Sequence, residues 1–421
     1  MVLWTYRENR LIVKLKKPYE TSLKIHNFEP KCDLSDEDEI IYDLPDNVSE
    51  FTLNNTTFKT KKGNRIMVSS CYGGAGLNRQ PYKFVNCDYH FIIGDLLYAD
   101  RHCKNKPRWL PDICDPKETY ICSDKADYDR LWKEEVFDIP ALADMLTKTG
   151  TTIIADDHEV FNNFNSRLVT PVFNEEEWKY IGPTTKQQET QNMYKCEQSI
   201  IDDAISSFKE NTMDNPLYYK IDYNRYLDIF ICDVRIERCK ETKYRMMSDE
   251  QLIWLVSSIN ASEKKYKILI TSVPLCYKKK IEKKIIEYKS ELEKFPHLKD
   301  AIFFKKFNPI IDRWEFHTRE MALLNPEIVP QRDILIDGIK HVRGLLVVGG
   351  DLHYGSIHII DGIKEVVSSS VGSVTKPIKI KDESFGTVIN HYIVLELNRN
   401  GIICNYYNSL TGENFHSEQV L

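Results

Sequence analysis

The sequence of 421 residues contains no apolar run long enough to span a membrane, because polar and charged residues interrupt every hydrophobic stretch. A transmembrane helix needs about 20 consecutive apolar residues. The first segment, MVLWTYRENRLIVKLKKPYE, also lacks the apolar centre of a secretory signal peptide. We therefore expect a cytoplasmic protein without a transmembrane segment.

Positive charge is not in excess either. The chain has 57 lysines and arginines against 63 aspartates and glutamates, which gives a net charge of −6. Binding to nucleic acid in general requires a basic surface, so we do not expect nucleic acid as a partner, although local basic patches stay possible. The most charged stretch, YKKKIEKKIIEYKSELEKF, is expected to form an exposed helix with ion pairs along it.

Cysteine is present eleven times, but the close paired spacing of a disulfide scaffold is missing. We expect most of these cysteines to be small buried hydrophobic residues in a reducing compartment. Cys103, Cys114 and Cys122 share one segment with His102, so a zinc site is an alternative there, although the usual pairing of zinc ligands is absent. The surrounding segment, Arg101–Asp127, matches no motif and is expected to shape a pocket.

The chain also lacks internal repeats and low-complexity linkers. Residues 1–62 consist of short alternating segments such as RLIVKLKK, which predict a small β-rich N-terminal region. Residues 63–421 contain short β-branched runs bounded by glycine, aspartate or serine, which predict buried strands. Helical patterns lie between them, and SDEQLIWLVSSIN opens with Ser248 as N-cap and Gln251 in a capping box. This alternation indicates an α/β fold.

Side chains that bind metals follow four of the predicted strands. In an open α/β sheet, ligands bind just outside the carboxyl ends of the strands, where several loops converge. Taken singly, each of these residues is as well explained by a turn aspartate, a packed tyrosine or a buried thiol. Their shared position after four strands favours a metal site instead. The residues are Cys71, Asp95 with Tyr98, Asp157 with His158, and Asp351 with His353.

The mixture of donor atoms predicts two kinds of metal ion. Thiolate, phenolate and imidazole suit a trivalent or softer ion, whereas carboxylates alone suit an ion that prefers oxygen. We expect Asp157 and Asp351 to hold the oxygen-preferring ion, with Asp95 bridging to its neighbour. The ligands expected for the softer ion are Cys71, Asp95, Tyr98 and His353.

The motifs GDLLYAD, ADDHEVFNN and GGDLHYG, with SSCYGGAG before them, resemble those of the alkaline phosphatase D (PhoD-like) metallophosphatases. The segments YLDIFICDVRIER, SDEQLIWL, TSVPL and DRWEFHTRE extend the resemblance from about Arg65 to about Asn408. These phosphatases belong to the calcineurin-like group, which includes the purple acid phosphatases. The resemblance implies a four-layer α/β/β/α sandwich, with residues 63–421 as the catalytic domain, and a metal-dependent phosphoesterase activity.

The resemblance also implies a role for each ligand of the first ion. Asp95 corresponds to the bridging carboxylate, Tyr98 to the phenolate on iron, and His353 to the imidazole on iron. Cys71 takes the position at which purple acid phosphatases use aspartate. The implied first ion is therefore Fe³⁺.

At the second ion, the sequence departs from the purple acid phosphatase pattern. Asp157 and Asp351 stand where those enzymes have an asparagine and a histidine. This replacement hardens the site toward Ca²⁺ or another divalent cation. Asp156 and Asn162 are further candidates for ligands or for supporting positions around the ions.

The catalytic roles implied by the resemblance fall on the turn after the third predicted strand. His158 corresponds to the histidine that contacts the phosphate and protonates the leaving group, and Asp156 is expected to assist it. Arg235 or Arg313 is expected to stabilise charge on the phosphate, with a structural ion pair as the favoured alternative for both. Glu159 is expected to bond either His158 or the backbone.

No motif marks the substrate side of the site. We expect a small phosphate ester, which leaves a monoester, a diester and a phospholipid headgroup open. Two alternatives to this reading remain: a non-catalytic phosphate-ligand-binding protein with the same fold, and a nuclease-type phosphodiesterase. The sequence makes no prediction about the oligomeric state.

Overall fold

The computed structural model describes most of the chain. The described residues are 2–7, 10–16, 23–24, 32–36, 39–45, 48, 50–53, 56–60, 62–73, 82–99, 102–103, 119–120, 122–161, 164, 173–182, 198–213, 216–239, 244–276, 278–373 and 375–421.

The first of two large sheets has six strands in the order β12-β9-β8-β20-β21-β22. Strands β8, β9 and β12 run parallel, and the three C-terminal strands add to β8 in antiparallel fashion. The predicted strands in RIMVSSC, YHFIIGD and TTIIADD are the three parallel strands. The bounds are β8 Arg65–Ser69, β9 Tyr89–Ile93, β12 Gly150–Ile154, β20 His391–Leu397, β21 Ile402–Asn408 and β22 Asn414–Gln419.

The second large sheet has seven strands in the order β13-β14-β15-β16-β18-β17-β19. Its central strands β14, β15, β16 and β18 are parallel, and antiparallel strands form both edges. The bounds are β13 Tyr219–Asn224, β14 Leu227–Ile231, β15 Tyr266–Ile270, β16 Leu345–Gly349, β17 Gly355–Ile360, β18 Ile363–Val367 and β19 Glu383–Thr387.

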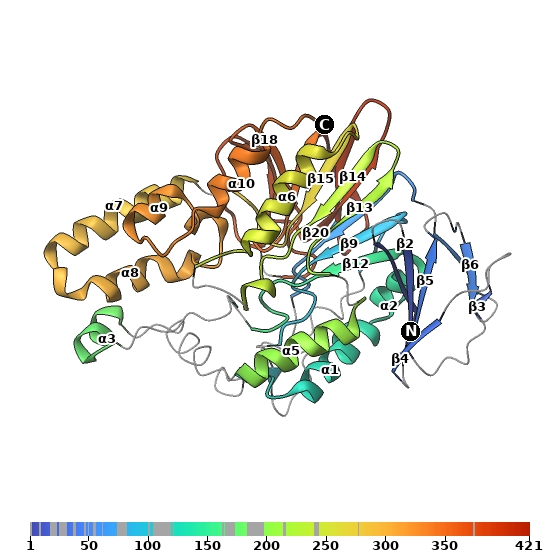
Figure 1. Ribbon diagram of the computed structural model, residues 1–421, viewed down its shortest axis with the longest axis horizontal. Coiled ribbons are helices and arrows are strands. Elements are labelled where there is room, and N and C mark those ends of the chain that lie inside the picture. Colours follow the sequence, from blue (N-terminus) through green and yellow to red (C-terminus); the bar gives the residue numbers. More distant parts are fainter. Residues whose placement is uncertain are drawn as a thin grey trace.

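The two sheets pack face to face, and helices cover both outer faces (Figure 1). Alternate residues of each strand enter the shared core, as Ile66 and Val68 do from one sheet and Leu346 and Val348 from the other. The four-layer α/β/β/α sandwich is therefore confirmed. On the six-stranded side lie α1 Lys125–Trp132, a π-helical turn at Lys133–Phe137, α2 Pro140–Lys148 and α5 Gln198–Asn211; on the other lie α6 Asp249–Ala261 and α10 Gln331–Ile339.

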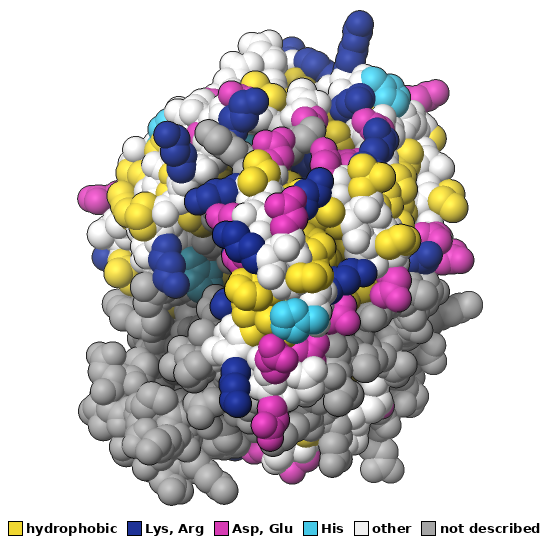
Figure 2. Space-filling view, turned by 90° about the vertical axis from the view of Figure 1, so that its left-hand side faces the viewer, with side chains coloured by type: hydrophobic (Ala, Val, Ile, Leu, Met, Phe, Trp, Pro, Cys, Tyr) yellow, Lys and Arg dark blue, Asp and Glu magenta, His cyan; other side chains and the backbone are white. Residues whose placement is uncertain are grey.

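A helical arm extends from the sandwich between β15 and β16 (left in Figure 1). It contains α7 Lys278–Lys294, α8 Lys299–Phe307 and α9 Arg319–Leu324, and α3 Glu175–Ile181 packs on α8. The prediction of a charged helix with ion pairs is confirmed in α7, where Glu287 pairs with Lys283 of the same helix and with Lys306 of α8. Figure 2 shows charges of both signs interspersed over this side. Among the described residues, no helix has the length and apolar character needed to cross a membrane.

The N-terminal region is β-rich, as predicted, and forms two small sheets. Its side chains enter the central core: Trp4 packs edge-on against Tyr89, and the Thr5 Oγ1 atom lies 3.1 Å from Thr152 Oγ1. The division after residue 62 stays a prediction. The bounds are β1 Val2–Arg7, β2 Arg10–Lys16, β3 Leu23–Lys24, β4 Cys32–Asp36, β5 Glu39–Pro45, β6 Glu50–Leu53 and β7 Thr56–Lys59.

Lys14 connects the N-terminal region to the sandwich through buried hydrogen bonds. Its buried Nζ donates to the carbonyl oxygens of Glu210 and Thr212, at 2.8 and 2.9 Å, at the C-terminal end of α5. A cation at this end satisfies carbonyl groups that the helix leaves without partners.

We expect Lys14→Met to lower the free energy of unfolding by about 2 kcal/mol, because buried carbonyls lose a charged donor. Urea unfolding measures this change. Lys148→Met is the control, since Lys148 forms an exposed pair with Asp144 and the loss of this pair should change stability by about 0–1 kcal/mol. Equal effects of the two substitutions would contradict this connecting role.

Candidate metal centre

The carboxyl ends of parallel strands from both sheets meet at one place. The Cys71 amide, after β8, donates to the Gly94 carbonyl, after β9, at 3.2 Å. The Ser70 Oγ donates to the Ser368 carbonyl, after β18 of the other sheet, at 2.7 Å. The loops that carry the predicted ligands are therefore bonded to one another across the two sheets.

These loops bring side chains that can bind metals into three overlapping groups. Within each group, one donor atom per residue lies within 4.8 Å of the others. Asp95 belongs to the first two groups and Asp157 to the last two, so the groups form one continuous centre. The groups are Cys71, Asp95 and His353; Asp95, Asp157 and His158; and Asp156, Asp157 and Asp351.

Tyr98 completes the set of predicted ligands. Its hydroxyl donates to Asp95 Oδ2 at 3.3 Å and lies 2.7 Å from Ser373 Oγ. Its ring stacks on the imidazole of His158, with centroids 4.1 Å apart. The structure thus places all six predicted ligands, and the predicted proton donor His158, in one centre.

Four of these residues have a backbone conformation that amino acids with side chains rarely adopt. The φ angles are 55° for Cys71, 55° for Asp95, 61° for Asp351 and 52° for His353. Such left-handed conformations cost about 1–3 kcal/mol each and concentrate at functional sites. Because these conformations are locally unfavourable, they do not stabilise the loops by themselves. Their occurrence at four predicted ligands supports a functional role for these residues.

Arg235 lies beneath the centre, completely buried. Its Nε donates to Asp156 Oδ1 at 2.6 Å, and its Nη1 donates to Asp312 Oδ2 at 3.3 Å. Ser272 also donates to Asp156 Oδ1, at 2.7 Å. Because Arg235 has no solvent exposure, the geometry favours the structural ion pair that was the alternative to a phosphate contact.

Arg313 differs from Arg235 in its access to solvent. Its side chain is 27% exposed, and its Nε lies 3.3 Å from Asp351 Oδ2. It therefore lies at the edge of the centre, with part of its side chain open to solvent.

Glu159 organises the backbone of the centre. Its Oε2 accepts hydrogen bonds from the amides of Asp95 and Asp156, at 3.1 and 2.8 Å, and its Oε1 accepts one from Leu96 at 2.7 Å. Of the two expected partners, His158 and the backbone, the structure shows these bonds to the backbone. Burial raises the pKa of Glu159, although the three amides oppose this shift.

We expect Glu159→Gln to reduce metal affinity, and the phosphoesterase activity predicted from the sequence, about 10- to 100-fold, because groups that orient ligands typically contribute this much. Steady-state kinetics and metal titration measure both effects. Glu177→Gln is a matched control, since the Glu177 carboxylate also accepts a backbone amide, that of Asn174 in the capping box of α3. Unchanged kinetics in Glu159→Gln would contradict the organising role.

Two serines beside the centre were not predicted from the sequence. The Ser369 Oγ lies 3.2 Å from Cys71 Sγ and accepts the His353 amide at 2.7 Å, while Ser373 contacts Tyr98. The sequence feature that could have indicated these two serines is the run VVSSSVGS, in which an apolar strand ends in serines.

Other predicted residues fall outside the part of the chain that can be described. The structure does not describe Asn162, Cys114 or the side chains of His102 and Cys103. The zinc alternative therefore stays a prediction. Cys122 is described and its side chain is buried.

The chemistry of the centre fits bound cations. Burial, followed by neighbouring acids, raises the pKa of Asp95 and of the Cys71 thiol. Burial also raises the pKa of Asp156 and Asp351, although arginines oppose the shift. Among the described residues, the buried Asp156 Oδ2 has no hydrogen-bond partner. Burying such oxygens is unfavourable unless a proton or a metal ion accompanies them.

Comparison with known proteins identifies the family. The profile of the PhoD-like phosphatases matches residues 72–403, most of the chain. The chain belongs to the PhoD-like phosphatase family. A solved structure of PhoD is 12% identical, with a TM-score of 0.61, and the match covers 99% of this chain and 88% of that one. No curated protein sequence matches.

Two further solved structures are similar to this PhoD-like phosphatase. GAP50, the anchor in the inner membrane complex of Plasmodium, is 13% identical over 85% of this chain and 88% of its own, with a TM-score of 0.40. A phosphopantetheinyl hydrolase from Mycobacterium tuberculosis is 10% identical over 73% of this chain and 90% of its own, with a TM-score of 0.29.

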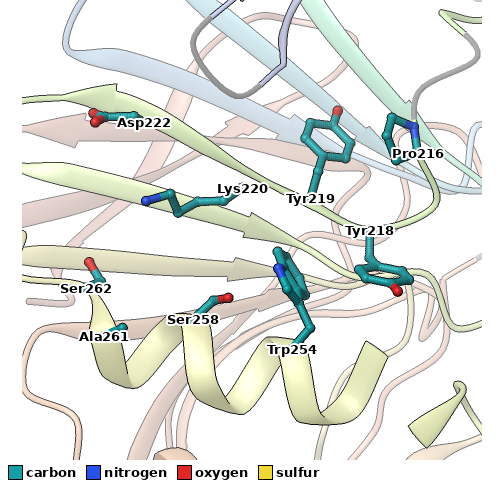
Figure 3. A pocket seen from close by; sticks show the side chains of 9 residues that line it. All are labelled: Pro216, Tyr218, Tyr219, Lys220, Asp222, Trp254, Ser258, Ala261 and Ser262. Atoms are coloured by element: carbon teal, nitrogen blue, oxygen red, sulfur yellow. The ribbon is translucent and has the colours of Figure 1, made fainter. Parts of the chain in front are cut away.

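A separate cavity of about 570 Å³ lies between β13 and α6 of this PhoD-like phosphatase (Figure 3). Trp254 and Tyr218, whose ring centroids are 5.1 Å apart, form one end of it, and Lys220 and Asp222 lie toward the other. None of the predicted ligands lines this cavity. We therefore assign it no part in the metal centre.

Removing metal should make the stability of this PhoD-like phosphatase depend on pH. Because burial raises the pKa of Asp95, Asp156 and Asp351 above the usual 3.8, the folded metal-free chain retains protons that the unfolded chain releases. The free energy of unfolding should then fall as the pH rises above 3.8 toward these raised values. Bound cations should remove this fall.

Urea unfolding of chelator-treated and metal-loaded protein, compared between about pH 5 and pH 8, measures the difference between the two forms. The stabilisation by metal should grow with pH. A stabilisation that shrinks as the pH rises would show that the buried acids do not bind the cations.

Proposed function

We propose that this chain is a metal-dependent phosphoesterase of the phosphatase or phosphodiesterase type, with residues 63–421 as its catalytic domain. The observation that carries the proposal is the shared position of Asp95 in two adjoining groups of donor atoms. Membership of the PhoD-like phosphatases supports the class of reaction.

We assign two ions to the centre. Cys71, Asp95, Tyr98 and His353 would hold Fe³⁺, because thiolate, phenolate and imidazole suit a softer or trivalent ion. The second ion, Ca²⁺ or another divalent cation, would be held by oxygen ligands. When bound, such ions supply Lewis acidity toward phosphate oxygens and make water a better nucleophile. The ligands proposed for the second ion are Asp95, Asp156, Asp157 and Asp351.

His158 is the proposed general acid. Its ring is fixed by stacking on Tyr98, and its backbone amide is 3.4 Å from Asp95 Oδ1. A positioned imidazole can give a proton to the departing alkoxide oxygen at near-neutral pH. The imidazole would therefore be held close to the proposed ligands, where it could protonate a leaving group.

We assign different roles to the two arginines beside the centre: one orients a proposed metal ligand, and the other would bind the phosphate. Arg235 orients Asp156 from below, so both act on the reaction through the centre. Arg313, at the exposed rim, would contact the phosphate oxygens and stabilise charge that develops there.

We propose a small phosphate ester as the substrate. The net charge of −6 gives no general attraction for nucleic acid. In Figure 2, the coloured part of the surface carries positive and negative side chains interspersed.

The test uses chelator-treated protein reloaded with iron and calcium, separately and together. Release of alcohol from chromogenic mono- and diesters is measured beside cleavage of single-stranded DNA. We expect metal-dependent hydrolysis of a small ester. Cleavage of DNA alone would favour the nuclease alternative, and phosphate binding without turnover would favour the non-catalytic one.

A further inference from the structure

A second group of metal-binding side chains lies apart from the candidate centre. It consists of Cys276, His358 and Glu365, all buried, whose donor atoms lie within 4.8 Å of one another. Cys276 follows β15, whereas His358 and Glu365 are paired neighbours on β17 and β18. All three lie on the outer face of the seven-stranded sheet, where Cys276 packs with Val347 and other residues beneath α6 and α10.

The orientation of each donor is fixed by a second bond. The Nδ1 of His358 lies 3.1 Å from Ser356 Oγ, so its Nε2 points to Glu365 Oε2 at 2.7 Å. The other oxygen of Glu365 accepts the Leu275 amide at 2.6 Å. Metal-binding histidines and carboxylates are typically held in this way by their remaining atoms.

A buried histidine–glutamate pair is the simplest alternative, and it accounts for two of the three side chains. It leaves out the Cys276 sulfur, which lies within 4.8 Å of the donor atoms of both side chains. Without a cation this thiol stays neutral, because burial and the carboxylate of Glu365 both raise the pKa of Cys276. A divalent cation bound to one thiolate, one carboxylate and one neutral imidazole has no net charge. Such a complex suits a dry core better than separate ions do.

We propose that Cys276, His358 and Glu365 form a structural zinc site. Sulfur, nitrogen and oxygen together are the ligands of Zn²⁺, and its bonds of about 2.0–2.3 Å bring neighbouring donors to roughly 3.3–3.8 Å. In the structure, His358 Nε2 and Glu365 Oε2 are 2.7 Å apart, and all three donor atoms lie within 4.8 Å of one another, so small side-chain movements would reach this range. Three protein ligands leave one position on the ion for a further donor.

Zinc here would tie the loop after β15 to β17 and β18. The same loop contains Ser272, which donates to Asp156 in the candidate centre, and the Leu275 carbonyl, which accepts from Arg332 at 2.8 Å. The site would therefore stabilise one wall of the centre without taking part in the reaction. It is independent of the proposed function, because zinc binding is measured without a substrate.

The first test compares zinc content after saturation and gel filtration. We expect Cys276→Ser to bind one equivalent less than the wild type, and His358→Gln to lose the same equivalent. Cys404→Ser is the matched control, because Cys404 is another buried free cysteine and lies in β21. Equal zinc content in the wild type and in Cys276→Ser would overturn the proposal.

A second test does not require a substitution in the proposed site. The Cys71→Ser protein, loaded with Co²⁺ in place of zinc, should retain a charge-transfer band from thiolate to cobalt, because Cys276 is still present. Cys71 and Cys276 are the described cysteines that belong to groups of possible ligands. Absence of the band would overturn the proposal even if Cys276→Ser failed to fold.

Discussion

Asp95→Asn should abolish most of the phosphoesterase activity, with a loss of about 1,000-fold or more. Asp95 is shared by two groups of donor atoms, so the substitution weakens the proposed binding of both ions. The several kcal/mol that metal ions contribute to a transition state correspond to at least this factor. Steady-state kinetics with a chromogenic ester, together with metal analysis, measure the loss.

Asp228→Asn is the matched control for this substitution. Asp228 is also a buried aspartate, in strand β14, but it accepts a hydrogen bond from Ser262 and belongs to none of the groups of possible metal ligands. Its replacement should leave the turnover number and the metal content close to those of the wild type. Full activity of the Asp95→Asn protein would refute the assigned centre.

Arg235→Gln should lower the free energy of unfolding by about 3–5 kcal/mol, because it leaves buried charges without their partner. The guanidinium of Arg235 bonds both Asp156 and Asp312, and all three side chains are buried. The effect should be largest in the metal-free protein, where no other cation offsets the acids. Urea unfolding of both forms measures it.

Arg65→Gln provides the comparison, since Arg65 pairs with Glu396 at a partly exposed position and should contribute about 0–1 kcal/mol. Arg235→Lys separates the two roles weighed for Arg235. If Arg235 orients Asp156, the lysine variant should lose stability as well as turnover. Normal stability with a large loss of turnover would instead indicate direct contact with the phosphate.

The sequence predicted the candidate site best where one short segment contains both a buried strand and the metal ligands that follow it. A buried strand that ends in Asp95 or Asp351 places the side chain at the edge of a sheet, and the convergence of parallel strands then predicts the centre. The four-layer order followed from the family resemblance, because hydrophobic runs alone do not say which strands share a sheet.

Features that depend on contacts between distant segments could not be predicted. Ser369 reaches Cys71 only because β18 and β8 end side by side, and nothing in the serine run specifies that partner. Glu159 was expected beside His158 or the backbone, and only the fold shows that it bonds the amides of both loops. The bond of Lys14 to α5 joins segments almost two hundred positions apart, as its contact with Thr212 illustrates.

Crystals of the protein loaded with iron and calcium, measured at the iron absorption edge, test the central claim most directly. The claim predicts an anomalous peak among the Cys71 Sγ, Tyr98 hydroxyl, Asp95 carboxylate and His353 imidazole. It also predicts a second ion, without iron signal, beside Asp157 and Asp351. Iron bound elsewhere, or no ion among these side chains in fully active protein, would contradict it.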